Sequence, residues 1–186
     1  MASTQKNFIR IANAGGYWGD DPFALRRQLH GDLKLDYISI DYLAEVTMSI
    51  LQKQRAKDPK AGYARDFITQ LKPHLKTVLD KKIKIITNAG GVNPTACAEA
   101  LFELARSQGV TLKIAVIDGD NINDRLNDLI GKGVAFKNMD TGEALAPYAS
   151  KVLAANAYFG AMPVVAALQG DPDILLCGRV TDTGIT

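Results

Sequence analysis

The sequence predicts an α/β protein with a mainly parallel β-sheet and helices on both faces. Short β-rich runs alternate with segments of helical periodicity, and the connections between the runs are too long for hairpins. This order implies parallel pairing and right-handed crossovers. The runs are also apolar throughout, as in strands that helices bury on both sides. An open, doubly wound, Rossmann-like sheet fits best, and a (β/α) barrel would need strands that the 186 residues do not contain.

Five strands are expected in the order in which the β-rich runs occur. They are residues 8–12, 37–41, 83–87, 112–117 and 173–177. The chain ends at Thr186, soon after the last expected strand and with no helix to cover that strand. We therefore expect residues 1–186 to be the N-terminal portion of a single, longer α/β domain, truncated after this strand.

Helices are expected between these strands. They are residues 23–29, a helix from about 43, 64–79, a helix from 93, 123–130 and 154–168. Pro73 lies inside the stripe of residues 64–79, so this helix either kinks there or forms two pieces. Gly160 and Pro163 interrupt the last helix, and residues 134–143 are expected to form an irregular segment or a hairpin.

The composition is that of a soluble globular protein, with 47% hydrophobic and 23% charged residues. No apolar run approaches the roughly 18 residues that span a membrane, and the net charge of +2 gives no general attraction to nucleic acid. Cys97 and Cys177 lie far apart and suggest no disulfide framework, which favours a cytoplasmic location. The expected partners are a small-molecule substrate and a second copy or a partner subunit.

Positive charge is concentrated between Lys53 and Lys84, where ten Lys and Arg residues outnumber three acidic residues. One interpretation is a solvated helical face. The other is a landing surface for an anionic ligand tail, such as the phosphates of coenzyme A.

Polar side chains come directly after every expected strand, at the carboxyl end, where open α/β sheets bind their ligands. They are Asn13, Asp41, Asn88, Asp118 with Asp120, and Arg179 with Asp182. A strand end needs some polar group to meet water, so one such residue indicates little. The repetition leads us to expect that several of them line one ligand site.

The sequence Asn-Ala-Gly-Gly occurs after both the first and the third strand, and the two loops lead to different helices. Gly90 and Gly91 lead to a helix opened by the neutral Asn93, whose free N–H groups and positive dipole end favour an anion. Gly15 and Gly16 lead to a helix behind two carboxylates and should prefer hydroxyl groups or a cation. The alternative is that both loops need glycine for packing alone.

The acidic residues at the strand ends could converge on one rim. They are Asp20, Asp41, Asp118, Asp120 and Asp182. Grouped carboxylates either raise a pKa to make a general acid or base, or hold a hard cation such as magnesium, for which Asp20 and Asp120 are the candidate ligands. His30 and His74 lie on helical segments away from the strand ends, so a histidine-based site is not expected.

Two further residues are candidates for ligand contact. Trp18 stands in the glycine-rich first loop and either forms a wall of an apolar or planar site or anchors the loop. Arg179 either pairs with an anionic substrate group or is tied to Asp182. The first loop also has some likeness to a dinucleotide fingerprint, but it lacks the spacer between the first two glycines.

Several blocks of the sequence resemble the acyclic terpene utilisation family, long catalogued as a domain of unknown function. They are residues 9–22 (IRIANAGGYWGDDP), 35–48 (from LDY to VTM), 62–67 (GYARDF), 87–94 (TNAGGVNP) and 178–182 (GRVTD). The resemblance implies catabolism of branched acyclic isoprenoids, whose later steps run on coenzyme A thioesters. A lyase or hydratase acting on a branched 3-hydroxyacyl or enoyl thioester fits that pathway.

The leading hypothesis is therefore an enzyme, or an enzyme subunit, that handles a branched acyl-CoA or a related carboxylate. Asn13 and Asn88 would orient or polarise a carbonyl group of the substrate. The carboxylates that would supply acid–base chemistry or a magnesium site are Asp41, Glu45, Asp118 or Asp182. The alternatives are a non-catalytic ligand-binding or assembly subunit and a nicotinamide-dependent oxidoreductase.

Overall fold

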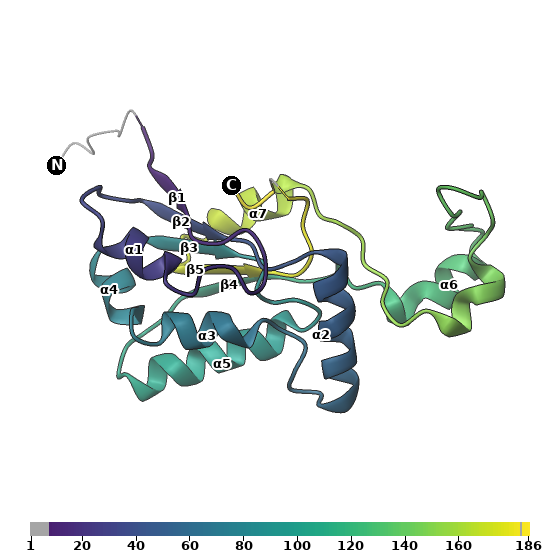
Figure 1. Ribbon diagram of the computed structural model, residues 1–186, viewed down its shortest axis with the longest axis horizontal. Helices are drawn as coiled ribbons and strands as arrows, with labels where there is room; N and C mark the ends of the chain where they lie inside the picture. The colour runs from purple at the N-terminus through teal and green to yellow at the C-terminus, as the bar shows by residue number, and fades with distance from the viewer. Residues whose placement is uncertain (1–7, 183) are drawn as a thin grey trace.

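The computed structural model describes residues 8–182 and 184–186, and its centre is a parallel β-sheet (Figure 1). The strands are β1 (Ile11–Asn13), β2 (Tyr37–Ile40), β3 (Lys84–Thr87), β4 (Ile114–Ile117) and β5 (Ile174–Cys177). Within the described residues they form one open sheet in the order β1-β2-β3-β5-β4, and every neighbouring pair is parallel. The predicted α/β fold class is confirmed.

The helices occur in the predicted order, with differences at two prolines. They are α1 (Ala24–His30), α2 (Glu45–Lys57), α3 (Arg65–Leu71), α4 (Leu75–Asp80), α5 (Pro94–Ser107), α6 (Leu126–Gly131) and α7 (Ala161–Leu168), with 3-10 turns η1 (Asn123–Arg125) and η2 (Ala146–Lys151). Pro73 separates α3 from α4, so the predicted stripe is two helices. The expected start of the last helix at residue 154 is wrong. Gly160 is the N-cap, and Pro163 lies in the first turn, where its missing N–H has no intrahelical partner to lose.

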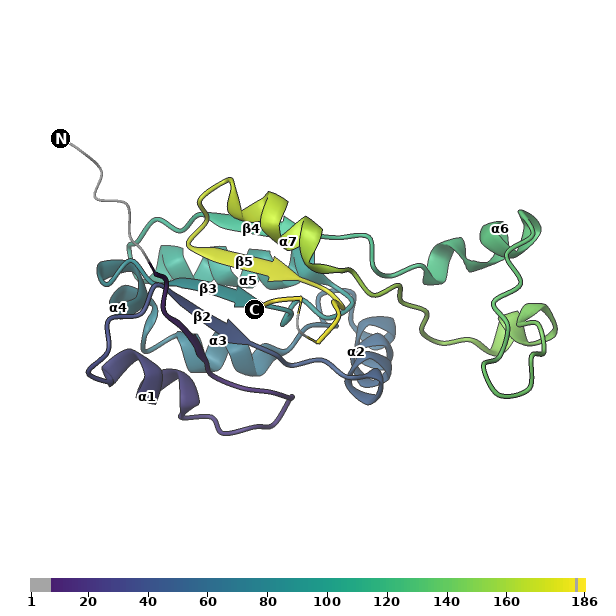
Figure 2. The ribbon, with the colours of Figure 1, turned by 90° about the horizontal axis from the view of Figure 1, so that it is seen from above.

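The connections place most helices on one face of the sheet. The chain moves from β1 through β2 to β3, and α3, α4 and α5 lie below the sheet in Figure 1. Leu25 and Leu29 of α1 are buried in the same core as these helices. After β3 the chain skips one position in the sheet and forms the edge strand β4, and it then comes back to form β5 between β3 and β4. This last crossover runs in the opposite direction, so its helix, α7, lies on the opposite face of the sheet (Figure 2). The reversal makes the carboxyl ends of β3 and β5 the place where an open α/β sheet binds ligands.

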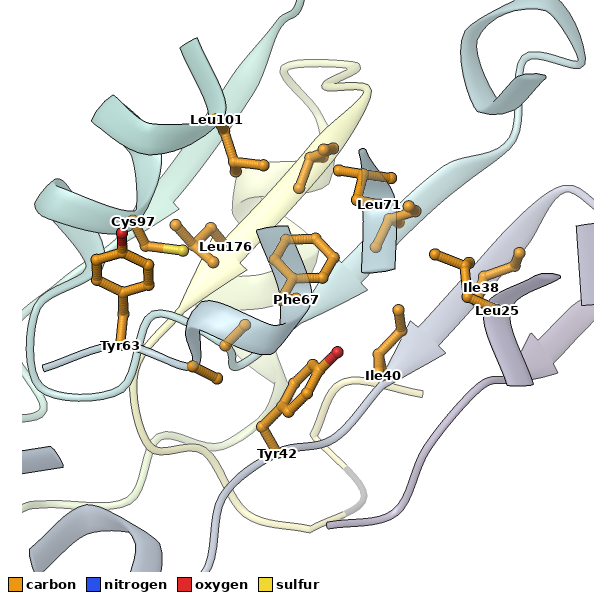
Figure 3. Packing of buried hydrophobic residues seen from close by; sticks show 14 of the residues in the cluster. Leu25, Ile38, Ile40, Tyr42, Tyr63, Phe67, Leu71, Cys97, Leu101 and Leu176 are labelled. Atoms are coloured by element: carbon orange, nitrogen blue, oxygen red, sulfur yellow. The ribbon is translucent and has the colours of Figure 1, made fainter. Parts of the chain in front are cut away.

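The main core fills the space between the sheet and the lower helices, with Phe67 of α3 at its centre (Figure 3). Phe67 has no exposed surface, and Ile38, Ile40 and Leu101 are at most 1% exposed. The ring of Tyr42 meets Phe67 edge-on, with ring centroids 6.1 Å apart. This packing fixes α3 against the ends of β2 and so positions the loop that carries Asp41.

A second, smaller core covers the other face. Val164 of α7 packs with Leu175 and Cys177 of β5, and the segment after β5 adds Val180 and Ile185. The expectation that the last strand lacks cover is wrong, because β5 lies between β3 and β4 and all four of its residues are buried.

The chain between β4 and α7 extends away from the carboxyl edge of the sheet as an arm, residues 121–158 (Figures 1 and 2). All residues of the arm are described, and Leu126 is the one that is buried. The expected irregular segment at 134–143 lies within it. None of the helices in the described part of the chain is long and apolar enough to cross a membrane.

Candidate functional site

The loops after β2 and β3 are joined by the side chain of Asn88. Asn88 is 1% exposed. Its Oδ1 accepts from the N–H of Tyr42 at 2.8 Å, and its Nδ2 donates to Asp41 Oδ1 at 2.6 Å. The same Asp41 oxygen accepts from the N–H of Leu43 at 2.9 Å. Asp41 is thus held by one carboxylate oxygen, and within the described residues its Oδ2 has no hydrogen-bond partner.

Arg179, directly after β5, continues this arrangement on the other side of Leu43. Its side chain is only 4% exposed. Nη1 donates to the Leu43 carbonyl at 2.8 Å, and Nη2 pairs with Asp182 at 3.0 Å and lies 3.6 Å from Glu45 Oε1. The guanidinium stacks over the ring of Tyr158, 4.3 Å from its centroid. The backbone of Leu43 therefore joins Asp41 to Arg179. Asn88, Asp41, Leu43, Arg179 and Asp182 together form a polar row across the ends of β2, β3 and β5.

The two carboxylates beside Arg179 face solvent, unlike the guanidinium. The Asp182 and Glu45 side chains are 79% and 74% exposed. The Tyr158 hydroxyl donates to Glu45 Oε1, and this hydrogen bond is the main cause that lowers the pKa of Glu45. The buried Arg179 guanidinium therefore lies at the edge of the sheet, and the two carboxylates between it and the solvent can move.

Asp120 is fully buried and holds the base of the arm to the end of β5. Its Oδ2 accepts from the N–H of Arg179 at 2.8 Å and from Asn156 Nδ2 at 3.1 Å. Its Oδ1 has no hydrogen-bond partner within the described residues and packs on Gly178, where an added Cβ would lie 2.3 Å away. Burial raises the pKa of this carboxyl. Asp118, in contrast, is exposed and accepts from the N–H of its neighbour Gly119, so it lies outside the row.

The first Asn-Ala-Gly-Gly loop is closed by its own side chains. Asn13 Oδ1 accepts from the N–H of Gly15, and Asp20 Oδ2 accepts from the N–H of Gly16, each at 2.9 Å. The N–H groups of Gly16 and Asp21 lower the pKa of Asp20. These donors are not presented to a pyrophosphate, and no feature of the loop, all of which is described, supports nicotinamide binding.

Asp20 and Asp41 line one small recess at this edge, whereas Asp120 lies by β4 and β5, at the other end of the strand order. Asp20 and Asp120 therefore do not form one site. Among residues 8–182 and 184–186, no group of three His, Cys, Asp or Glu side chains could hold a metal ion. The magnesium site expected from Asp20 and Asp120 does not fit this geometry.

The second Asn-Ala-Gly-Gly loop is packed from both sides. The N–H groups of Gly91 and Asn93 donate to carbonyls of the same loop, at 3.1 and 2.9 Å. A Cβ on Gly90 would lie 2.6 Å from the Cys177 carbonyl oxygen, and Gly91, with φ of 56°, lies against Gly62. These glycines thus serve packing, and these two N–H groups are not free for an anion. Contact of Gly90, Gly91 or Asn93 with a ligand stays a prediction.

Sequence reasoning missed Tyr158 and Asn156, because neither is next to a strand. Tyr158 contacts a residue 113 positions away, and Asn156 one 36 positions away. No local pattern marks such residues, which are brought to the site by the path of the arm.

The chain matches the family described as acyclic terpene utilisation family protein AtuA over residues 9–186. It therefore belongs to the acyclic terpene utilisation family, as the sequence blocks suggested. No curated protein and no solved structure matched the chain.

Proposed function

We propose that this protein is an enzyme, or a subunit of one, that breaks down acyclic isoprenoids by acting as a lyase or hydratase on a branched acyl-CoA or a related carboxylate. The observation that carries the proposal is the polar row from Asn88 through Asp41 and Leu43 to Arg179 and Asp182. It occupies the ends of β2, β3 and β5, beside the point where the connections change face. Membership of the acyclic terpene utilisation family supports a role in the use of acyclic terpenes.

Asp41 is the group best placed for acid–base chemistry. Its Oδ1 is fixed by two hydrogen bonds while Oδ2 has no partner in the described residues. In a hydration, Oδ2 would take a proton from the water whose oxygen adds to the β-carbon, and the protonated Asp41 carboxyl would then give a proton to the α-carbon. Asn88 is buried against Asp41 and acts as a positioning residue.

Arg179 is the group best placed to hold negative charge on the substrate. Its guanidinium is buried, and its carboxylate partners Asp182 and Glu45 are largely exposed. Because exposed ion pairs are weak, a substrate carboxylate or a developing enolate oxygen can replace one of them at Nη2. No step is assigned to a metal ion.

The test is turnover of branched enoyl-CoA and 3-hydroxyacyl-CoA thioesters, measured by the absorbance of the conjugated thioester. Asp41→Asn should lower kcat by about 10²–10⁴, and Asn88→Ala and Asp182→Ala should lower it less. Asp118→Asn is the matched control, because Asp118 lies at the same edge but outside the row. Unchanged turnover in both Asn88→Ala and Asp182→Ala would show the assignment to be wrong.

A second candidate, a non-catalytic assembly subunit, is favoured by the arm. Met139, Leu153 and Tyr148 expose 99%, 61% and 48% of their surfaces. A partner subunit or a second copy could cover them. Tight ligand binding without turnover until a partner subunit is added, together with a larger sedimenting species, would favour this candidate over the first.

A further inference from the structure

A cleft separate from the polar row lies between the first loop and the C-terminal end of α2. It has a volume of about 270 Å³. Its walls are mainly apolar, and it is lined by Trp18, Gln54, Lys57, Asp58, Ala61, Tyr63 and Arg65. The volume lies just below the roughly 300–1,000 Å³ typical of small-molecule sites, which suits one planar ring system rather than a whole large ligand.

Two aromatic side chains in the cleft are held in place from outside it. Trp18 packs against the main core, and its Nε1 donates to Asp66 Oδ2 at 2.6 Å, which fixes the first loop to α3. Tyr63 is 9% exposed, and Gly91 allows the backbone at residues 62 and 63 to approach closely. The first glycine-rich loop therefore contributes Trp18 to the wall of the cleft, and the second glycine-rich loop supports the backbone of Tyr63.

Two cations, Lys57 and Arg65, and the carboxylate of Asp58 line the cleft, and the carboxylate of Asp66 binds the Trp18 N–H beside them. Arg65 pairs with Asp58 at 3.1 Å. Lys57 has no hydrogen-bond or ion-pair partner within the described residues. A fixed aromatic wall next to a free ammonium group matches a ligand that combines a planar ring with a phosphate.

We propose that this cleft binds the ring and phosphate of an adenine nucleotide. Bases stack on aromatic side chains with useful affinity, and a lysine binds phosphate as a point charge. The inference deepens the proposed function if the nucleotide is the adenosine phosphate end of coenzyme A, and in that form it rests on the proposed function. A free adenine nucleotide would use the same chemistry.

Trp18 is the single tryptophan of the chain, so its fluorescence reports on the cleft directly. Titration with adenosine 3′,5′-bisphosphate should quench it saturably, and adenosine should bind more weakly because it lacks the phosphate. Lys57→Gln should weaken binding of the bisphosphate by about tenfold, a factor typical of one hydrogen bond to a charged group. Lys53→Gln is the matched control, because Lys53 is exposed on the same helix but does not line the cleft.

Calorimetry gives an independent readout that does not need the tryptophan, and Trp18→Ala should abolish binding there. Absence of saturable quenching, or equal binding by the wild type and Lys57→Gln, would overturn the proposal. Tighter binding of the bisphosphate and coenzyme A than of ADP assigns the site to coenzyme A, and equal binding assigns it to free nucleotides.

The two proposals can fail separately. Nucleotide binding without turnover of any branched thioester would leave this site standing and remove the proposed reaction. Turnover without quenching by the bisphosphate would remove this site and leave the reaction.

Discussion

Replacing Gly178 with alanine should destabilise the protein through Asp120. The new Cβ would lie 2.3, 2.6 and 2.7 Å from Oδ1, Cγ and Oδ2 of Asp120, so the whole carboxyl group must move. Oδ2 then gives up its hydrogen bonds from the Arg179 N–H and from Asn156. A hydrogen bond is worth about 1 kcal/mol when neutral and about 1.5–3 kcal/mol when charged, so the loss of two gives about 2–6 kcal/mol.

The assay is urea unfolding monitored by circular dichroism. Gly131→Ala is the control, since among the described residues no atom beyond its chain neighbours and its own helical turn lies within 4 Å of its added Cβ, and it should be neutral or slightly stabilising. In an Asp120→Ala background the clash is gone, and Gly178→Ala should then cost less than about 1 kcal/mol. If the two substitutions proved additive, the contact between Gly178 and Asp120 would not be the cause.

Burial of particular side chains gives three more expected outcomes. Burial raises the pKa of Asp120, so the folded state binds this proton more tightly than the unfolded state. The free energy of unfolding of the wild type should therefore fall, relative to that of Asp120→Asn, as pH rises above about 4. A constant difference between the two proteins across a pH series would contradict this. Phe67→Ala should lower the free energy of unfolding, measured in urea, by about 3–5 kcal/mol. Phe102→Ala, at a site that is 48% exposed, should lower it much less. Equal losses of stability in the two variants would contradict the packing of Phe67 in the core. Burial raises the pKa of Cys177 to about 12 and raises that of Cys97 further. Neither thiol should therefore react with a disulfide reagent at neutral pH until the protein unfolds. Rapid labelling of the native protein would contradict the burial of these thiols.

The order of strands and helices could be predicted because each element carries its own periodicity. The division at Pro73 was predictable for the same local reason. The position of β5 inside the sheet was not, because strand order depends on how each crossover packs. The cover over the last strand results from that order, and no local signal in residues 173–177 indicates it.

The candidate site was predictable only in part. Polar residues at strand ends were readily identified, and the structure joins Asn88 with Asp41 and Arg179 with Asp182 and Glu45. Whether the second Asn-Ala-Gly-Gly loop has free N–H groups for an anion could not be judged from sequence. Its glycines are in contact with residues 62 and 177, which are distant in the chain.

The most direct test of the polar row is a thermal-shift titration with a branched acyl-CoA. A ligand present at 100 times its Kd stabilises the folded state by about 2.7 kcal/mol, enough for a clear rise in Tm. We expect this rise for the wild type and for Asp118→Asn, and a much smaller rise for Arg179→Met, which removes the buried cation. Equal shifts in all three proteins, or no shift in any of them, would contradict the claim that this row binds the substrate.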